Sequence, residues 1–274
     1  MAADPTRKLT SFLATWAGDP RRRMVVRDNN LTALQEALAR GDVHVVTTRA
    51  RGYATWLCGS GQARVLAGDA HGWQDVRLGA ALLRTAMVLA HRHFARVPRG
   101  TARRPQPIDC ANSTAMALAL GDPDADELYR WHRHGWPADT QMPDYAVYVQ
   151  ALLDLRANGH TDAIGHCGAH DGVLRAWATD GLGDALDAAL QWHTGPGVRD
   201  DDEAVGEFVD ITVSAFPVEV LAVLAVCRVR GLPLPRLRHA LGTTPLCSPP
   251  LDGAWPDDPI LDRVHALLQT VPGR

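Results

Sequence analysis

The sequence predicts an all-α fold, with antiparallel helix pairs in a solenoid-like helical array and little or no β-structure. Three observations indicate this. Apolar residues recur at spacings of three and four, Gly, Asn, Asp and Pro stand where helices would begin or end, and β-branched runs are scarce. With 274 residues, 46% of them apolar and 22% charged, the chain can bury a substantial core.

In the first third of the chain, helix signals surround one ambiguous run. Asn30 can cap a helix that starts at Leu31 and ends before Gly41. Residues 80–94 carry the apolar stripe of a long helix. Residues 43–48 are rich in β-branched side chains, so they are compatible with a strand or with a helix start.

The remainder of the chain carries helix signals almost throughout. Gly121 ends one helix, and Asp122 caps the next with Pro123 at its first position. Residues 115–135 and 148–171 resemble each other as helix–turn–helix units, although no fixed period continues along the chain. The predicted helices cover residues 113–120, 122–135, 144–157, 161–177, 182–192, 203–213, 218–230 and 260–268.

The charges divide the chain into two regions. Residues 1–107 hold 17 basic and seven acidic residues, whereas residues 108–274 hold 11 basic and 24 acidic ones. We therefore distinguish a basic helical region, 1–95, from an acidic helical region, 108–274, joined by a basic proline-rich connection, 96–107. We expect the two to pack as one continuous domain. All basic residues except Lys8 are arginine, which we ascribe to a GC-rich genome rather than to function.

The cysteines and the apolar runs indicate where in the cell the protein is expected to reside. Five cysteines without short pairing, and an N-terminus without signal-peptide character, favour reduced, buried thiols in a cytoplasmic protein. The longest apolar run, 218–227, is interrupted by Glu219 and is shorter than the ~20 residues that span a bilayer. We expect no membrane contact.

Enzyme motifs are missing from the sequence. It contains no Gly-x-Ser-x-Gly elbow, Walker loop or dinucleotide fingerprint, so we expect no enzyme, no cofactor and no metal. One alternative is a metal-dependent hydrolase, because His166 and His170 would share a helix face, with Cys167 between them. The His-x-His pairs at 91/93 and 132/134 point apart on a helix and cannot share an ion.

The basic region raises the possibility of nucleic-acid binding. Its arginines are spread over loops without interleaved aromatic residues or a helix-turn-helix pattern. We expect them to be solvated or to pair with the acidic region, and we expect no direct contact with nucleic acid. The arginines concerned are Arg21, Arg22, Arg23, Arg27, Arg99, Arg103 and Arg104.

The acidic region offers a more specific signal. Acids favour helix N-termini, yet runs of four exceed what capping requires. The surplus would steer a basic protein to this surface. The candidate partner-binding acids are Asp200, Asp201, Asp202, Glu203 and Glu207, then Asp122, Asp124, Asp126 and Glu127. Aromatic anchors are expected near such an interface, and Trp131, Trp136 and Trp192 are candidates, with burial in the core as the alternative.

One C-terminal pattern resembles a known family. Residues 215–224 read Ala-Phe-Pro-Val-Glu-Val-Leu-Ala-Val-Leu, followed by Arg-Val-Arg-Gly-Leu-Pro-Leu at 228–234 and Thr-Pro-Leu at 244–246. This is similar to immunity protein family forty-nine of bacterial polymorphic toxin systems. Pro217, Glu219 and Leu221 match its motif and are interpreted as holding the fold.

The resemblance implies an all-α cytoplasmic protein that binds and neutralises a cognate toxin domain, a nuclease or deaminase with a basic surface. An acidic inhibitor would cover that surface. The alternative is a helical-repeat scaffold or regulator that binds another protein.

Overall fold

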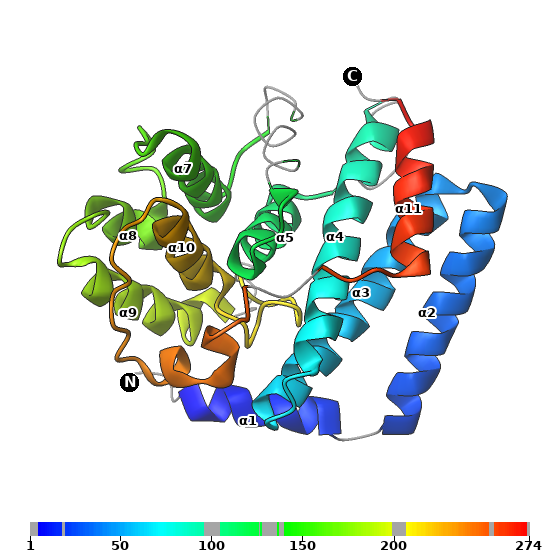
Figure 1. Cartoon of the computed structure of the whole chain (residues 1–274), viewed down its shortest axis with the longest axis horizontal. Coiled ribbons are helices and arrows are strands. Elements are labelled where there is room, and N and C mark those ends of the chain that lie inside the picture. The colour runs from blue at the N-terminus through cyan, green and yellow to red at the C-terminus, as the bar shows by residue number, and fades with distance from the viewer. Residues whose placement is uncertain are drawn as a thin grey trace.

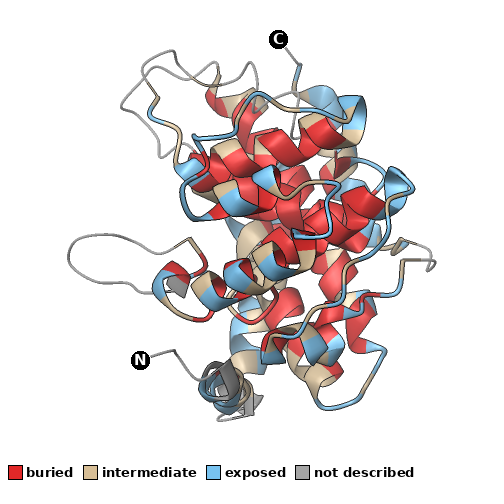
Figure 2. Ribbon diagram, turned by 90° about the vertical axis from the view of Figure 1, so that its left-hand side faces the viewer, coloured by how far each residue is buried: buried red, intermediate tan, exposed pale blue. Residues whose placement is uncertain are grey.

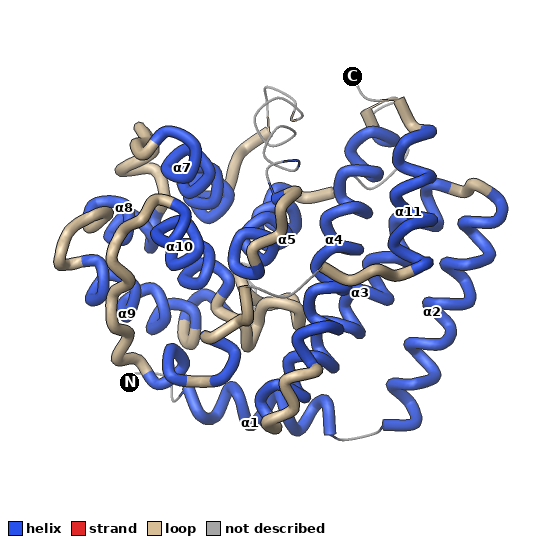
Figure 3. The backbone as a smooth tube through the Cα atoms, in the orientation of Figure 1, coloured by secondary structure: helices blue, strands red, loops and turns tan. Residues whose placement is uncertain are grey.

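The computed structural model describes residues 5–17, 20–95, 105–125, 127, 136, 140–198, 207–251 and 255–272. No strand occurs within these segments, so the predicted all-α fold is confirmed (Figure 3). The α-helices are α1 (Pro5–Ala17), α2 (Pro20–Arg40), α3 (Val43–Leu66), α4 (Gly72–Phe94), α5 (Pro107–Leu120), α7 (Asp144–Asn158), α8 (Asp171–Arg175), α9 (Leu182–His193), α10 (Val218–Val229) and α11 (Pro259–Thr270).

The ambiguous run at residues 43–48 is the beginning of α3. Asp42 caps this helix, because its side chain accepts a hydrogen bond from the Val45 amide at 3.1 Å. A capped start and packing against α2 and α4 outweigh the modest β-preference of the valines. α2 begins at Pro20, well before the predicted Leu31, and Asn30 lies inside it, where its amide donates to the Val26 carbonyl at 3.0 Å.

Helices α3 and α4 pack tightly over most of their length (Figure 1). Two glycines permit this approach: a Cβ on Gly61 would lie 2.5 Å from the Gly72 carbonyl oxygen, and one on Gly79 would lie 2.5 Å from Cys58 Sγ. Gly59 and Gly61 both lie within α3. Neighbouring helices leave no room for a side chain at either position, which explains glycine inside this helix.

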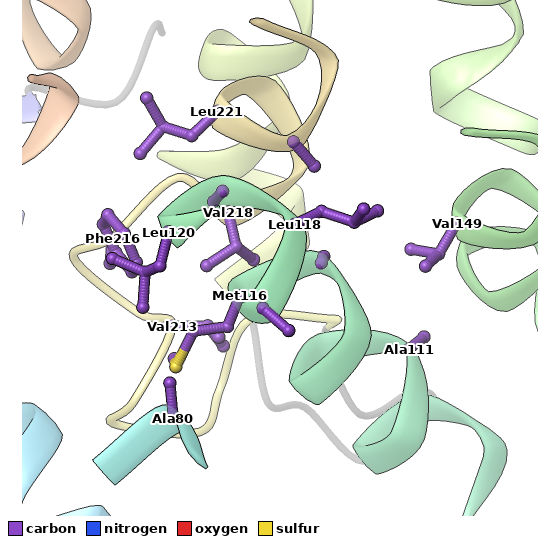
Figure 4. Packing of buried hydrophobic residues seen from close by; sticks show 14 of the residues in the cluster. Ala80, Ala111, Met116, Leu118, Leu120, Val149, Val213, Phe216, Val218 and Leu221 are labelled. Atoms are coloured by element: carbon purple, nitrogen blue, oxygen red, sulfur yellow. The ribbon is translucent and has the colours of Figure 1, made fainter. Parts of the chain in front are cut away.

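Helix α10 is the centre of the acidic region. Its residues from Val218 to Cys227 are all buried, and it packs against α5, α7 and α9 (Figures 1 and 4). Met116, Leu118 and Leu120 of α5 contribute to this packing (Figure 4). Packing here does not follow chain order, since α10 packs against α5, which ends about a hundred residues before α10 begins.

Several predicted helices appear nearly as expected, and two do not. The predictions for residues 144–157, 182–192, 218–230 and 260–268 match α7, α9, α10 and α11 closely. The prediction over 161–177 is wrong, because only a short 3-10 turn and the five-residue α8 form there. Residues 207–213, the described part of the helix predicted at 203–213, form turns, and most of 122–135 lies outside the described residues.

Buried apolar residues of both charge regions belong to one cluster that reaches from Phe12 in α1 to Leu268 in α11 (Figure 2). α11 returns from the end of the chain to pack on α4 and α2 (Figure 1). In the described segments, no helix combines the length and apolar character needed to cross a bilayer.

Candidate functional site

The acids at 122–127 surround one buried arginine. Arg84 lies on α4 with 4% of its side chain exposed, and its guanidinium contacts three carboxylates. The distances are 2.8 Å to Asp122, 3.1 Å to Asp124 and 3.1 Å to Glu127. Arg92 also approaches Glu127 at 3.5 Å. The cationic partner of this acidic cluster is therefore supplied by the basic region of the same chain.

Burial separates the members of this cluster, which we call the Arg84 cluster (Arg84, Asp122, Asp124 and Glu127). The Asp122 side chain is 1% exposed and also accepts a hydrogen bond from the Asp124 amide at 2.8 Å. It has no exposed oxygen to offer a partner protein. Asp124 is 61% exposed and Glu127 is 22% exposed, so only Asp124 lies openly on the surface. Asp126 and Trp131, predicted with this set, lie outside the described residues.

Glu207 is also held within the fold. Its carboxylate accepts a hydrogen bond from Trp192 Nε1 at 2.9 Å, and its carbonyl oxygen accepts one from the Asn112 side chain at 3.0 Å. Burial, reinforced by the negative charges of Glu219 and Asp144, raises the pKa of Glu207 to about 7. It is thus a partly protonated group at neutral pH. The neighbouring acids Asp200, Asp201, Asp202 and Glu203 lie outside the described residues.

The two other tryptophans predicted as aromatic anchors, Trp136 and Trp192, are also held within the fold. Trp192 is half-buried and its indole N–H is committed to Glu207. Trp136 is half-buried with its ring 4.8 Å from that of His91, edge to face. Both positions correspond to the core alternative rather than to an open anchor.

A second buried polar cluster escaped the sequence analysis. His193 Nδ1 lies 2.9 Å from Glu219 Oε1, and both side chains are fully buried. His193 Nε2 faces the Ser214 carbonyl oxygen at 3.3 Å, so both ring nitrogens face oxygen acceptors. That arrangement suits an imidazolium paired with a carboxylate. We call His193, Glu219, His170, Tyr145 and Tyr148 the histidine–tyrosine cluster.

Aromatic rings surround this pair from α7, the 3-10 turn Gly168–His170 and the 207–217 segment. Phe208 stacks on His193 with ring centroids 4.4 Å apart, and Tyr148 stacks on His170 at 4.5 Å. Tyr148 Oη donates to the Glu219 carbonyl oxygen at 3.3 Å. The ring nitrogens of His170 and the hydroxyl of Tyr145 have no hydrogen-bond partner among the described residues.

Titration in this cluster is governed by burial. Desolvation lowers the pKa of His170 to about 4, so this ring is neutral at physiological pH. Desolvation and the charge of Glu219 raise the pKa values of Tyr145 and Tyr148. One signal could have revealed the cluster: Glu219 is the lone acid in an apolar helix, and a buried carboxylate requires a partner. The cluster joins α7, α9 and α10, and neither the His193 nor the Glu219 side chain has exposed surface.

The alternative metal site is not assembled. His166 is exposed on an irregular turn, whereas His170 is buried, so the predicted shared helix face does not exist. Asp171 instead accepts hydrogen bonds from the Gly165 and Cys167 amides at 2.8 and 3.1 Å. Among the described residues, no three His, Cys, Asp or Glu side chains converge to hold a metal ion. All five cysteines are buried free thiols, as predicted.

Several arginines of the basic region are paired within the chain. Arg51 contacts Asp109 at 3.0 Å, Arg64 contacts Asp69 and Asp75 at 2.8 and 2.6 Å, and Arg27 contacts Asp28 at 2.6 Å. Arg99, Arg103 and Arg104 lie outside the described residues. The expected pairing with the acidic region is thus seen for Arg51, Arg84 and Arg92.

No family model matches this chain, and no curated protein or solved structure is significantly similar to it. The resemblance to immunity protein family forty-nine stays a hypothesis.

Proposed function

We propose that this chain is an immunity-type inhibitor that binds a basic toxin domain, a nuclease or deaminase, and covers its active or substrate-binding surface with an acidic face. The proposal rests on the motif resemblance at 215–246 and on the charge of the acidic region. Inhibitors of this kind gain association rate from electrostatic attraction to a surface built for nucleic acid.

The observation that carries the proposal is the excess of acidic over basic side chains that remains in the acidic region after ion pairing within the chain. From residue 105 onward, the described part of the chain holds 17 acidic side chains and seven arginines. Arg51, Arg84 and Arg92 offset part of this excess of ten. The sequence adds the run Asp200–Glu203, which ends four positions before Glu207.

We do not place the Arg84 cluster in the proposed binding face, because Arg84 and Arg92 offset much of its negative charge and Asp122 is buried. The acids proposed to bind the toxin are instead the run at residues 200–203, which lies outside the described residues, and Asp144, an exposed acid at the start of α7 whose charge contributes to the raised pKa of Glu207. Long-range attraction needs exposed charge, which Asp144 offers and Asp122 does not.

Binding and growth rescue test the proposal together. The chain is co-expressed with the toxin-like open reading frame beside its gene, and we expect growth to be rescued. The purified pair is then compared with a variant in which Asp200, Asp201, Asp202 and Glu203 are changed to lysine. We expect at least ~10-fold weaker affinity and a shallower salt dependence.

A matched control separates the binding face from total charge. Asp162, Asp180, Asp257 and Asp262 are exposed acids elsewhere in the acidic region, and their change to lysine alters net charge by the same amount. Affinity should be nearly retained in that variant. Equal loss in both variants would contradict a localised face, and failure to rescue growth would favour the scaffold alternative.

A further inference from the structure

A polar pocket of ≈ 440 Å³ is lined by α3, α4 and the start of α5, and nothing in the proposed function uses it. Its apolar side is formed by Met87, Ala90 and Phe94 of α4, whose side chains are almost fully buried. The rest of the lining carries an ion pair, three threonine hydroxyls and the imidazole of His44. This volume, with an apolar side and a few polar groups, is typical of small-molecule sites.

The ion pair at this pocket keeps hydrogen-bonding atoms free on both partners. Arg51 Nη2, on α3, donates to Asp109 Oδ2 at 3.0 Å, and Asp109 lies in the first turn of α5. Among the described residues, this contact engages one guanidinium nitrogen and one carboxylate oxygen, so other N–H donors and Oδ1 remain. The two side chains are 40% and 29% exposed, and both line the pocket. A ligand therefore meets a donor directly beside an acceptor.

The threonine hydroxyls around the pocket act as acceptors toward a ligand. Thr47 and Thr48 both donate to the His44 carbonyl oxygen, at 2.8 and 3.2 Å. Thr55 donates to the Arg51 carbonyl oxygen at 2.9 Å. A hydroxyl whose proton is directed to its own helix offers its lone pairs to the pocket. Acceptors thus prevail in the polar lining, and they suit a ligand with several hydroxyl or N–H donors.

The balance of charge within the ion pair narrows the class of ligand further. Because Arg51 and Asp109 carry opposite charges, they favour neither a simple anion nor a simple cation. They match a neutral group that has an acceptor beside a donor. A ring lactam has this pattern on one edge, where its C=O stands next to its N–H. Its flat ring can lie against the apolar side chains of α4.

We propose that this pocket binds a 6-oxopurine nucleoside, whose base carries such a lactam edge. The purine N1–H donates to Asp109 Oδ1, and its O6 accepts a hydrogen bond from the Arg51 guanidinium. The ring lies against Met87 and Phe94, and the ribose hydroxyls donate to the threonine hydroxyls. The volume of the pocket suits a two-ring base with its sugar. The proposal is independent of the inhibitor function.

Calorimetric titration of the full chain with inosine and with 1-methylinosine tests the proposal. The two nucleosides differ only in the N1–H, which a methyl group replaces in the second. We expect inosine to bind at least ~10-fold more tightly, because only inosine can donate to the Asp109 carboxylate.

A pair of matched variants locates the site. Asp109→Asn should weaken inosine binding by at least ~10-fold and leave 1-methylinosine binding unchanged, since it removes the charged acceptor. Asp75→Asn is the control. Asp75 lies in the first turn of α4, is 27% exposed, and pairs with Arg64 at 2.6 Å outside this pocket. It should leave both affinities unchanged. Because both ion pairs are partly exposed, we expect both variants to fold.

A third variant keeps the test valid if Asp109→Asn alters α5. Thr48 lines the pocket but is exposed on α3, so Thr48→Trp fills the pocket without entering the core. It should abolish inosine binding while the midpoint of thermal unfolding stays the same. The proposal is overturned if inosine fails to bind, binds no better than 1-methylinosine, binds equally to the Thr48→Trp protein, or is weakened as much by Asp75→Asn as by Asp109→Asn.

Discussion

The Arg84 cluster and the histidine–tyrosine cluster bury charge in opposite ways. In the first, a permanently charged guanidinium meets three carboxylates at 2.8–3.1 Å. In the second, Glu219 meets an imidazole at 2.9 Å, and the neighbouring His170 and Tyr145 have polar atoms without partners among the described residues. The first cluster should tolerate changes of pH and fail when its cation is removed. The second should respond to pH and tolerate replacement by apolar side chains.

The largest effect is expected from removing the guanidinium. Arg84→Met leaves the buried Asp122 carboxylate without a cation, which typically costs about 3–5 kcal/mol. Urea unfolding measures this loss. Asp124→Asn is the control, because Asp124 contacts the same guanidinium but is 61% exposed, and its loss should cost under ~1 kcal/mol. Similar losses in both variants would contradict the role assigned to burial.

The same cluster shows what the sequence could predict. The prediction that Gly121 ends α5 is confirmed, since Gly121 adopts the left-handed conformation with φ +72°. Asp122 accepts the Asp124 amide as a capping residue would, although most of the helix that it was predicted to cap lies outside the described residues. Both signals are local. Arg84 lies 38 residues before Asp122, and nothing local distinguishes it from the other arginines. The surplus of acidic residues was therefore visible in the sequence, whereas their pairing with Arg84 was not.

Helical spacing also failed to predict the backbone where a side chain accepts backbone amide hydrogen bonds in place of the helix. Residues 161–177 have helical spacing, yet Asp171 accepts the Gly165 and Cys167 amides and fixes an irregular turn before α8. The buried His170 then faces Tyr148 instead of sharing a helix face with His166. The metal-ligand pair expected from the sequence, His166 and His170, required the helix predicted over 161–177 and does not form without it.

An intermediate effect is expected from the second cluster. Glu219→Met alone leaves His193 buried without its carboxylate, and we expect a loss of about 1–3 kcal/mol, the cost of an unsatisfied buried polar group. Glu219→Met combined with His193→Leu removes both polar partners. It should recover most of that loss, because an apolar pair can replace a buried ion pair. A double-mutant cycle measures the coupling, and additivity within ~0.5 kcal/mol would show that the contact contributes nothing specific.

The smallest effect is a change in how stability depends on pH. Glu207 has a folded pKa of about 7, above the ordinary value of 4.5, so the folded state holds an extra proton between these values. Its contribution is fully present below pH 4.5 and is lost as the pH rises through 7. His170 has a folded pKa of about 4, below its ordinary 6.5, so its contribution is present above pH 6.5 and is lost as the pH falls through 4.

These opposing dependences overlap between pH 4.5 and 6.5 and mask each other in the native protein. Glu207→Gln should make unfolding free energy rise more steeply with pH in this window, and His170→Phe should make it fall. Each change in slope is limited to ~1.4 kcal/mol per pH unit, the value for one proton. Urea unfolding at half-unit pH steps measures both slopes. A shift of both variants in the same direction would contradict the assignment of Glu207 as protonated and His170 as neutral in the folded state.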